Sequence, residues 1–156
     1  MATEVAAWRQ GYLATDEFDD LTTDEIEHLV SRLTFTRFKK GDALLDNFAR
    51  SEVVVFVVAG SVDVVSEGRR LHTRAAGELV WDLRYFDPAL QPHDVAGASA
   101  GVLACLTHAD LEDLAEDKPI MALSLLRAFG TSAVRSVSER HNASAKGGEK
   151  PTAAGK

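Results

Sequence analysis

Residues 39–82 have the sequence KKGDALLDNFARSEVVVFVVAGSVDVVSEGRRLHTRAAGELVWD, in which Gly41, Gly60 and Gly77 separate β-rich runs. Glycine adopts positive φ without a steric penalty, so these three positions suit tight turns. Residues 53–58 form an unbroken run of β-branched and aromatic side chains, short enough for a strand buried on both faces. The run after Gly60 alternates valines with polar residues, as in a half-buried strand. Strands and turns at this spacing predict a small antiparallel sandwich or barrel.

More strands are expected on either side of the central runs. They are predicted over residues 34–38, 69–74 and 93–106. In the second of these, Leu71 and Thr73 alternate with His72 and Arg74, so the two pairs occupy opposite faces of the strand. The sequence therefore predicts a β region of about eight short strands.

Helices are predicted before and after this β region. Residues 3–14 can form a short helix, and Thr22 with Glu25 matches a capping box ahead of an amphipathic run. Thr107 is an N-cap followed by an acidic first turn. Pro119 suits the first turn of the longest helix, which extends to residue 140. Its apolar stripe comprises Ile120, Met121, Leu123, Leu125, Leu126, Phe129, Ala133, Val134 and Val137.

The fold class that follows is mainly β with flanking α. It is an antiparallel β-roll or jelly roll (a double-stranded β-helix) with N-terminal and C-terminal helices. We expect an N-terminal helical extension over residues 1–17, one globular domain over 18–141 and a disordered tail over 142–156. The tail contains little besides Ala, Ser, Lys, Gly, Glu, Pro and Thr, which cannot bury a core. The 156 residues are 46% hydrophobic, enough for one core.

The charge and the cysteine count exclude several classes of function. A net charge of −7 argues against a nucleic-acid or anionic-membrane surface, because both need clustered lysine and arginine. Cys105 is the single cysteine and stands in an apolar run, which predicts a buried, inert thiol rather than a nucleophile. There is no 18-residue apolar span for membrane insertion and no signal-peptide pattern, so we expect a cytoplasmic protein.

No catalytic or metal-binding pattern stands out. The histidines are scattered and include no His-x-His pair, which metal-binding cupins use. These histidines are His28, His72, His93, His108 and His141. No Ser, His and acidic set has a recognisable nucleophile context, and Gly97-Ala98-Ser99-Ala100 is not a nucleophile elbow. We expect no enzyme activity, no metal and no cofactor. A cupin-like metal-binding β-roll remains a third alternative, which metal analysis of the purified protein would test.

The order of these elements resembles that of a cyclic-nucleotide-binding domain over residues 18–140. Five motifs in the same order carry the resemblance: Phe18-x-x-Leu21, FKKGD at 38–42, FVVAGSVDV at 56–64, AGELV at 76–80 and LACLTHADL at 103–111. The resemblance implies a β-roll that holds its ligand in a phosphate-binding cassette. In that family a Gly-Glu pair contacts the ribose hydroxyl, and an arginine after a loop proline pairs with the cyclic phosphate.

The cassette of this chain departs from the family at both key positions. The resemblance places ligand-binding positions at Trp81, Asp82, Leu83, Arg84, His93, Asp94 and Val95. Trp81 replaces the glycine and is expected to fill the pocket, whereas Asp82 is one methylene shorter than glutamate. His93 and Asp94 stand where the arginine is expected. Losing one buried charge-assisted pair costs roughly 2–5 kcal/mol, so we expect no binding of cyclic AMP or cyclic GMP. Arg84 is expected to be a solvated surface side chain rather than a substitute for that arginine.

The sequence therefore predicts a non-enzymatic regulatory or protein-interaction module. Met121, Leu125, Leu126 and Phe129 give the helix over residues 119–140 more apolar surface than one sheet face needs, so we expect a protein partner or self-association there. In relatives the equivalent helix often dimerises or closes over the pocket. The alternative is a sensor that still binds a cyclic nucleotide or another anion through Asp82, His93 and backbone N–H groups.

Overall fold

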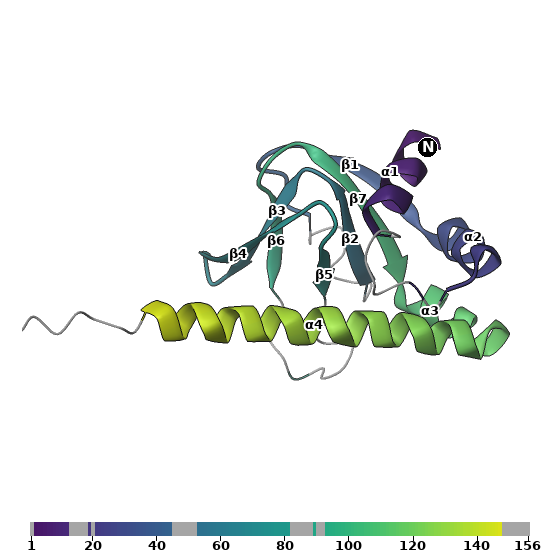
Figure 1. The fold of residues 1–156 in the computed structure, drawn as a ribbon. Coiled ribbons are helices and arrows are strands. Elements are labelled where there is room, and N and C mark those ends of the chain that lie inside the picture. Colours follow the sequence, from purple (N-terminus) through teal and green to yellow (C-terminus); the bar gives the residue numbers. More distant parts are fainter. Residues whose placement is uncertain are drawn as a thin grey trace, which may run out of the picture.

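The computed structural model describes residues 2–12, 19, 21–44, 53–81, 89 and 93–147, and it confirms the predicted fold class (Figure 1). The strands are β1 (Thr34–Phe38), β2 (Val53–Ala59), β3 (Ser61–Ser66), β4 (Arg69–Ala75), β5 (Leu79–Trp81), β6 (Asp94–Gly97) and β7 (Gly101–Thr107). The helices are α1 (Ala2–Tyr12), α2 (Thr23–Arg32), α3 (His108–Asp117) and α4 (Pro119–Gly147). An isolated bridge between Ala43 and Ala96 adds to the seven strands of the described part. Phe18, from the first family motif, lies outside the described residues.

The strands form two antiparallel sheets. One has the order β1-β7-β2-β5 and the other β4-β3-β6. The chain passes from the first sheet to the second at Gly60, which has a φ of 78°. Gly41 and Gly77 also have positive φ, so the prediction for all three glycines is confirmed.

The β2 strand separates two hydrophobic clusters, which explains why its run is apolar throughout. Val55 and Val57 belong to the cluster inside the roll, whereas Phe56 and Val58 belong to the cluster under the helices. Successive side chains of a strand point to opposite faces, so a strand buried on both sides needs apolar residues at every position. The inner cluster comprises Phe38, Leu44, Val55, Val57, Val62, Val64, Val80, Val95, Leu103 and Cys105.

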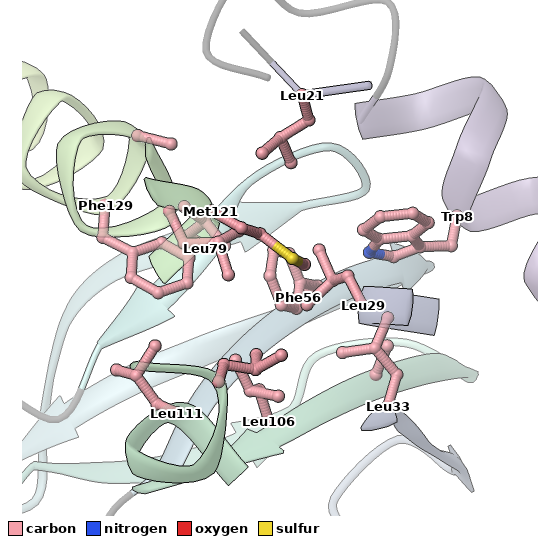
Figure 2. Close-up of a cluster of buried hydrophobic side chains, with 14 of the residues drawn as sticks. Trp8, Leu21, Leu29, Leu33, Phe56, Leu79, Leu106, Leu111, Met121 and Phe129 are labelled. Carbon is pink, nitrogen blue, oxygen red and sulfur yellow. The ribbon is translucent and has the colours of Figure 1, made fainter. Parts of the chain in front are cut away.

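The cluster under the helices is the larger of the two (Figure 2). It joins side chains of all four helices to β2, β5 and β7. Among its largest fully buried members are Trp8, Leu29, Phe56, Leu106, Leu114, Met121, Leu125 and Phe129. This cluster holds the helices against the outer face of the first sheet.

Two glycines near the ends of β6 and β7 allow backbones to approach closely. A Cβ added at Gly97 would collide with the carbonyl oxygen of Lys39, and one added at Gly101 would collide with that of Ala59. Such collisions are with the backbone, which cannot rotate away. These positions therefore require glycine because of tertiary contact and not because of φ.

Both predicted helix starts are confirmed. Thr22 and Glu25 form a complete capping box at α2, and Thr107 and Asp110 form another at α3. In each box the threonine hydroxyl accepts a hydrogen bond from the backbone N–H of the acidic residue, and the carboxylate accepts one from the backbone N–H of the threonine. Two backbone donors at the start of the helix are thereby satisfied. Arg32, at the end of α2, then pairs with Asp113 of α3 at 3.1 Å.

The longest helix begins at Pro119 as predicted, but its end differs from the prediction. Disorder was expected from residue 142, whereas α4 continues to Gly147. Extending an existing helix gains one hydrogen bond for each residue that is fixed. The alanines and the lysine in 142–147 also favour helix. The prediction from composition therefore ended the helix too early. Residues 148–156 lie outside the described part, and the proposed domain limits stay a prediction. No described helix is long and apolar enough to cross a membrane.

Candidate functional site

The inward face of the second sheet carries polar side chains beside the inner cluster. Residues paired across neighbouring strands point to the same face. His72 is paired with Val64, and Arg74 with Val62, both buried valines of the inner cluster. The alternation within β4 is as predicted, and the structure shows that its polar pair faces the interior.

Arg74 is held at the turn between β4 and β5. Its side chain is 12% exposed, and its Nη1 lies 3.1 Å from Oε1 of Glu78. The other carboxylate oxygen of Glu78 accepts a hydrogen bond of 2.6 Å from the backbone N–H of Ala75. The guanidinium is therefore fixed and charge-paired on the inner side. The sequence analysis did not identify Arg74 as a site residue. Two signals for it were present in the sequence: the alternation of polar residues in β4, and Glu78 four residues after Arg74.

The predicted site residues next to β6 are divided between two faces. Val95 is buried in the inner cluster, whereas Asp94 is exposed. His93 is half-buried, and its Nδ1 is buried without a hydrogen-bond partner among the described residues. By alternation His93 shares the inward side with Val95, so Asp94 turns its charge away from the interior.

The other predicted site residues come after β5. The backbone of Trp81 pairs with Val54 of β2 and ends the strand. The Trp81 side chain lies outside the described part of the structure, as do Asp82, Leu83 and Arg84. Whether the indole fills the pocket thus stays a prediction.

The apolar stripe expected on α4 is divided between two faces of the helix. Met121, Leu125 and Phe129 are fully buried in the cluster under the helices. These side chains, which the sequence suggested as a surplus binding surface, are thus occupied within the chain. The sequence could not assign them because apolar residues run around most of this helix.

The exposed apolar side chains of α4 lie on its other face. Ile120 is 75% exposed, Leu123 49% and Val134 66%. At about 100° per residue, these positions lie on the side of the helix opposite Leu125. The solvent side of α4 therefore offers an apolar surface to another protein.

Within the described residues, no group of three histidine, cysteine or acidic side chains is arranged to hold a metal ion. Burial raises the pKa of the Cys105 thiol to about 12, so it is protonated at neutral pH. Beside the inner cluster, the described residues place apolar side chains, the charge-paired guanidinium of Arg74 and the imidazole of His93.

Comparison with solved structures identifies the fold. A cyclic nucleotide-binding domain from Methylobacillus flagellatus matches with a TM-score of 0.78 at 13% identity, over 96% of this chain and 87% of that one. The N-terminal domain of a transcriptional regulator from Streptomyces coelicolor matches with a TM-score of 0.60 at 19% identity, over 93% and 99%.

A third match is the regulatory subunit of a cAMP-independent protein kinase A from Trypanosoma brucei, with a TM-score of 0.63 at 18% identity. The match covers 83% of this chain and 48% of that subunit, so this chain spans about half of it. No protein-family model matches the sequence, and no curated protein matches it. The chain has the fold of the cyclic nucleotide-binding domains.

Proposed function

We propose that this protein is a non-enzymatic regulatory module that acts through protein contacts and does not bind cyclic AMP or cyclic GMP. The observation that carries the proposal is that Ile120, Leu123 and Val134 are exposed on the solvent face of α4, while the opposite face of the helix packs in the core. Large apolar side chains gathered on one face of a helix favour association with another protein.

The sequence of the cassette supports the loss of cyclic-nucleotide binding. Position 93 holds a histidine in the region where the resemblance to cyclic-nucleotide-binding domains implies an arginine that pairs with phosphate. An imidazole lacks the planar, permanently charged fork with which a guanidinium binds phosphate through two hydrogen bonds. A solved structure of this fold is the regulatory subunit of a protein kinase A described as cAMP-independent, which supports a regulatory role without this ligand.

Calorimetric titration with cyclic AMP, cyclic GMP and cyclic dinucleotides tests the ligand part of the proposal. We expect no binding heat with the wild-type protein. Micromolar binding to any of these nucleotides would overturn it. The matched variant combines Trp81→Gly with His93→Arg, and we expect binding to arise only in that variant. If the wild type already binds and the double variant merely tightens it, the protein is a sensor.

A second candidate function rests on the inward position of His72 and Arg74. The guanidinium of Arg74 is paired with Glu78, so a small anion other than a cyclic nucleotide would bind inside the roll by sharing its N–H donors with that carboxylate. Titration with inorganic phosphate tests it, with Arg74→Ala as the variant and the exposed Arg70→Ala as its control. Binding that only Arg74→Ala abolishes would favour this function over the first.

A further inference from the structure

The β4 strand forms one edge of the second sheet (Figure 1). Among the described strands only β3 pairs with it. The N–H of Ala76 bonds to the carbonyl oxygen of Gly60 at 3.1 Å, which makes this a hydrogen-bonded pair, and such pairs alternate along an antiparallel ladder. The main-chain groups of His72 and Arg74 therefore point toward β3, whereas those of Thr73 point away from the sheet.

Glu78 closes one end of this edge. Its carboxylate accepts the hydrogen bond from the outward N–H of Ala75 and pairs with Arg74. A strand added along β4 can therefore bond to both main-chain groups of Thr73 but not to the N–H of Ala75. Two copies of β4 paired antiparallel around Thr73 would meet this obstacle twice, once in each copy. The edge thus suits a short peptide better than a second copy of itself.

Leu71 gives the edge an apolar contact. The register between β3 and β4 shifts between Val64 and Val65, which leaves Leu71 without a residue paired to it across the strands. Its side chain is 44% exposed, and it is the one large exposed apolar side chain that the described residues place outside α4. Leu71 shares a face with Thr73, so an apolar side chain opposite Thr73 on an added strand would lie beside it.

Arg69 and Arg70 give the edge its charge. Both side chains are exposed, and neither forms an ion pair with a described residue. The acids nearest in this hairpin are Glu67 in the turn and Asp63, whose carboxylate accepts a hydrogen bond of 2.5 Å from the hydroxyl of Thr73. The chain as a whole carries a net charge of −7. An acidic peptide is therefore repelled by the chain as a whole and attracted to the two arginines.

We propose that the β4 edge binds an extended, acidic segment of another protein, which adds a strand beside Thr73. An apolar side chain of the segment lies against Leu71, and its carboxylates lie near the two arginines. Main-chain hydrogen bonds supply affinity in this mode of recognition, and the side chains supply specificity. This inference goes beyond the proposed function, which rests on the solvent face of α4.

A labelled synthetic peptide that alternates glutamate with valine tests the proposal by fluorescence anisotropy. Its matched control has lysine in place of each glutamate. We expect only the acidic peptide to bind, and we expect added salt to weaken it, because exposed charges are screened. Equal binding of the two peptides would overturn the acidic partner, and no binding of either would overturn the site.

Substitutions on β4 and on α4 separate this site from the proposed function. Arg69→Ala combined with Arg70→Ala should raise the dissociation constant of the acidic peptide about tenfold. Arg127→Ala, at an exposed position of α4, is the matched control and should leave it unchanged, as should Leu123→Asp. Binding that Leu123→Asp abolishes and the double arginine variant retains would place the peptide on α4 and contradict the proposal.

Amide hydrogen exchange of the wild-type protein locates the added strand. The N–H of Thr73 points away from β3, so we expect it to exchange rapidly in the free protein and about tenfold more slowly with saturating acidic peptide. The N–H of His72 points toward β3 and should exchange slowly in both samples. Exchange at Thr73 that the bound peptide does not slow, or that is already slow in the free protein, would overturn strand addition at this edge.

Discussion

Trp8 of α1 packs edge-on against Phe56 of β2, with ring centroids 5.8 Å apart and ring planes at 84° (Figure 2). Both side chains are fully buried. The tryptophan belongs to the same cluster as Phe129 of α4, whose ring lies 6.2 Å from that of Phe56. The helix expected to be an N-terminal extension is therefore built into the core.

Replacing Trp8 with alanine should destabilise the protein by about 3–5 kcal/mol, as for other large core aromatic residues. Chemical denaturation followed by circular dichroism measures the change. The control is Leu71→Ala, at an exposed position of β4, for which we expect less than about 0.5 kcal/mol. Equal losses in the two variants would show that α1 does not contribute to the core.

Gly101→Ala should cost about 1–3 kcal/mol, because the new methyl would collide with the backbone carbonyl of Ala59. Gly11→Ala in α1 should instead raise the stability, because alanine favours helix and an added Cβ there meets nothing within 4 Å. Thermal unfolding of the two variants side by side checks the contrast. A stabilised Gly101→Ala protein would mean that β2 and β7 do not approach as closely as described.

The capping box of α2 should make part of the stability depend on pH. Hydrogen bonds from the backbone N–H and then the hydroxyl of Thr22 lower the pKa of Glu25. A carboxyl group with a lowered pKa stabilises the folded state above its unfolded pKa of about 4.3, and this contribution is lost as the pH falls through the folded value. Glu25→Gln should therefore be less stable than the wild type at pH 7.

Unfolding titrations at pH 7 and at pH 3 measure that difference, which should shrink at the lower pH. Glu116→Gln, at an exposed position of α3, is the control and should show little difference at either pH. Thr22→Ala removes the cap hydroxyl and should cost about 1 kcal/mol at pH 7. A Glu25→Gln deficit that does not change with pH would contradict the assignment.

Cys105 should react with a thiol reagent only when the protein unfolds. Burial raises its pKa to about 12, so the reactive thiolate is scarce at pH 8 and the sulfur is shielded. Absorbance with an aromatic disulfide reagent should show no reaction in buffer and one equivalent in guanidinium chloride. Rapid reaction of the native protein would show that the inner cluster opens readily.

Local sequence was enough to predict the features that local interactions decide. The capping residues Thr22 and Thr107 were identified because an N-cap bonds to backbone groups three residues away. The glycine turns were identified because positive φ is a property of a single residue. The unbroken apolar run in β2 predicted burial on both faces, since each face of a strand takes alternate residues. Together these features were sufficient for the fold class.

Contacts between distant elements decided the rest. The sequence of α4 is apolar around much of its circumference, and only packing against the roll selected Met121, Leu125 and Phe129 for burial while leaving Ile120 and Leu123 exposed. The pairing register with β3, in turn, directed Arg74 into the roll. The sequence by itself determined which elements form, because hydrogen bonds and φ preferences act within a few residues. Only the tertiary structure decided which side of each element faces the core, because burial depends on what lies across from it.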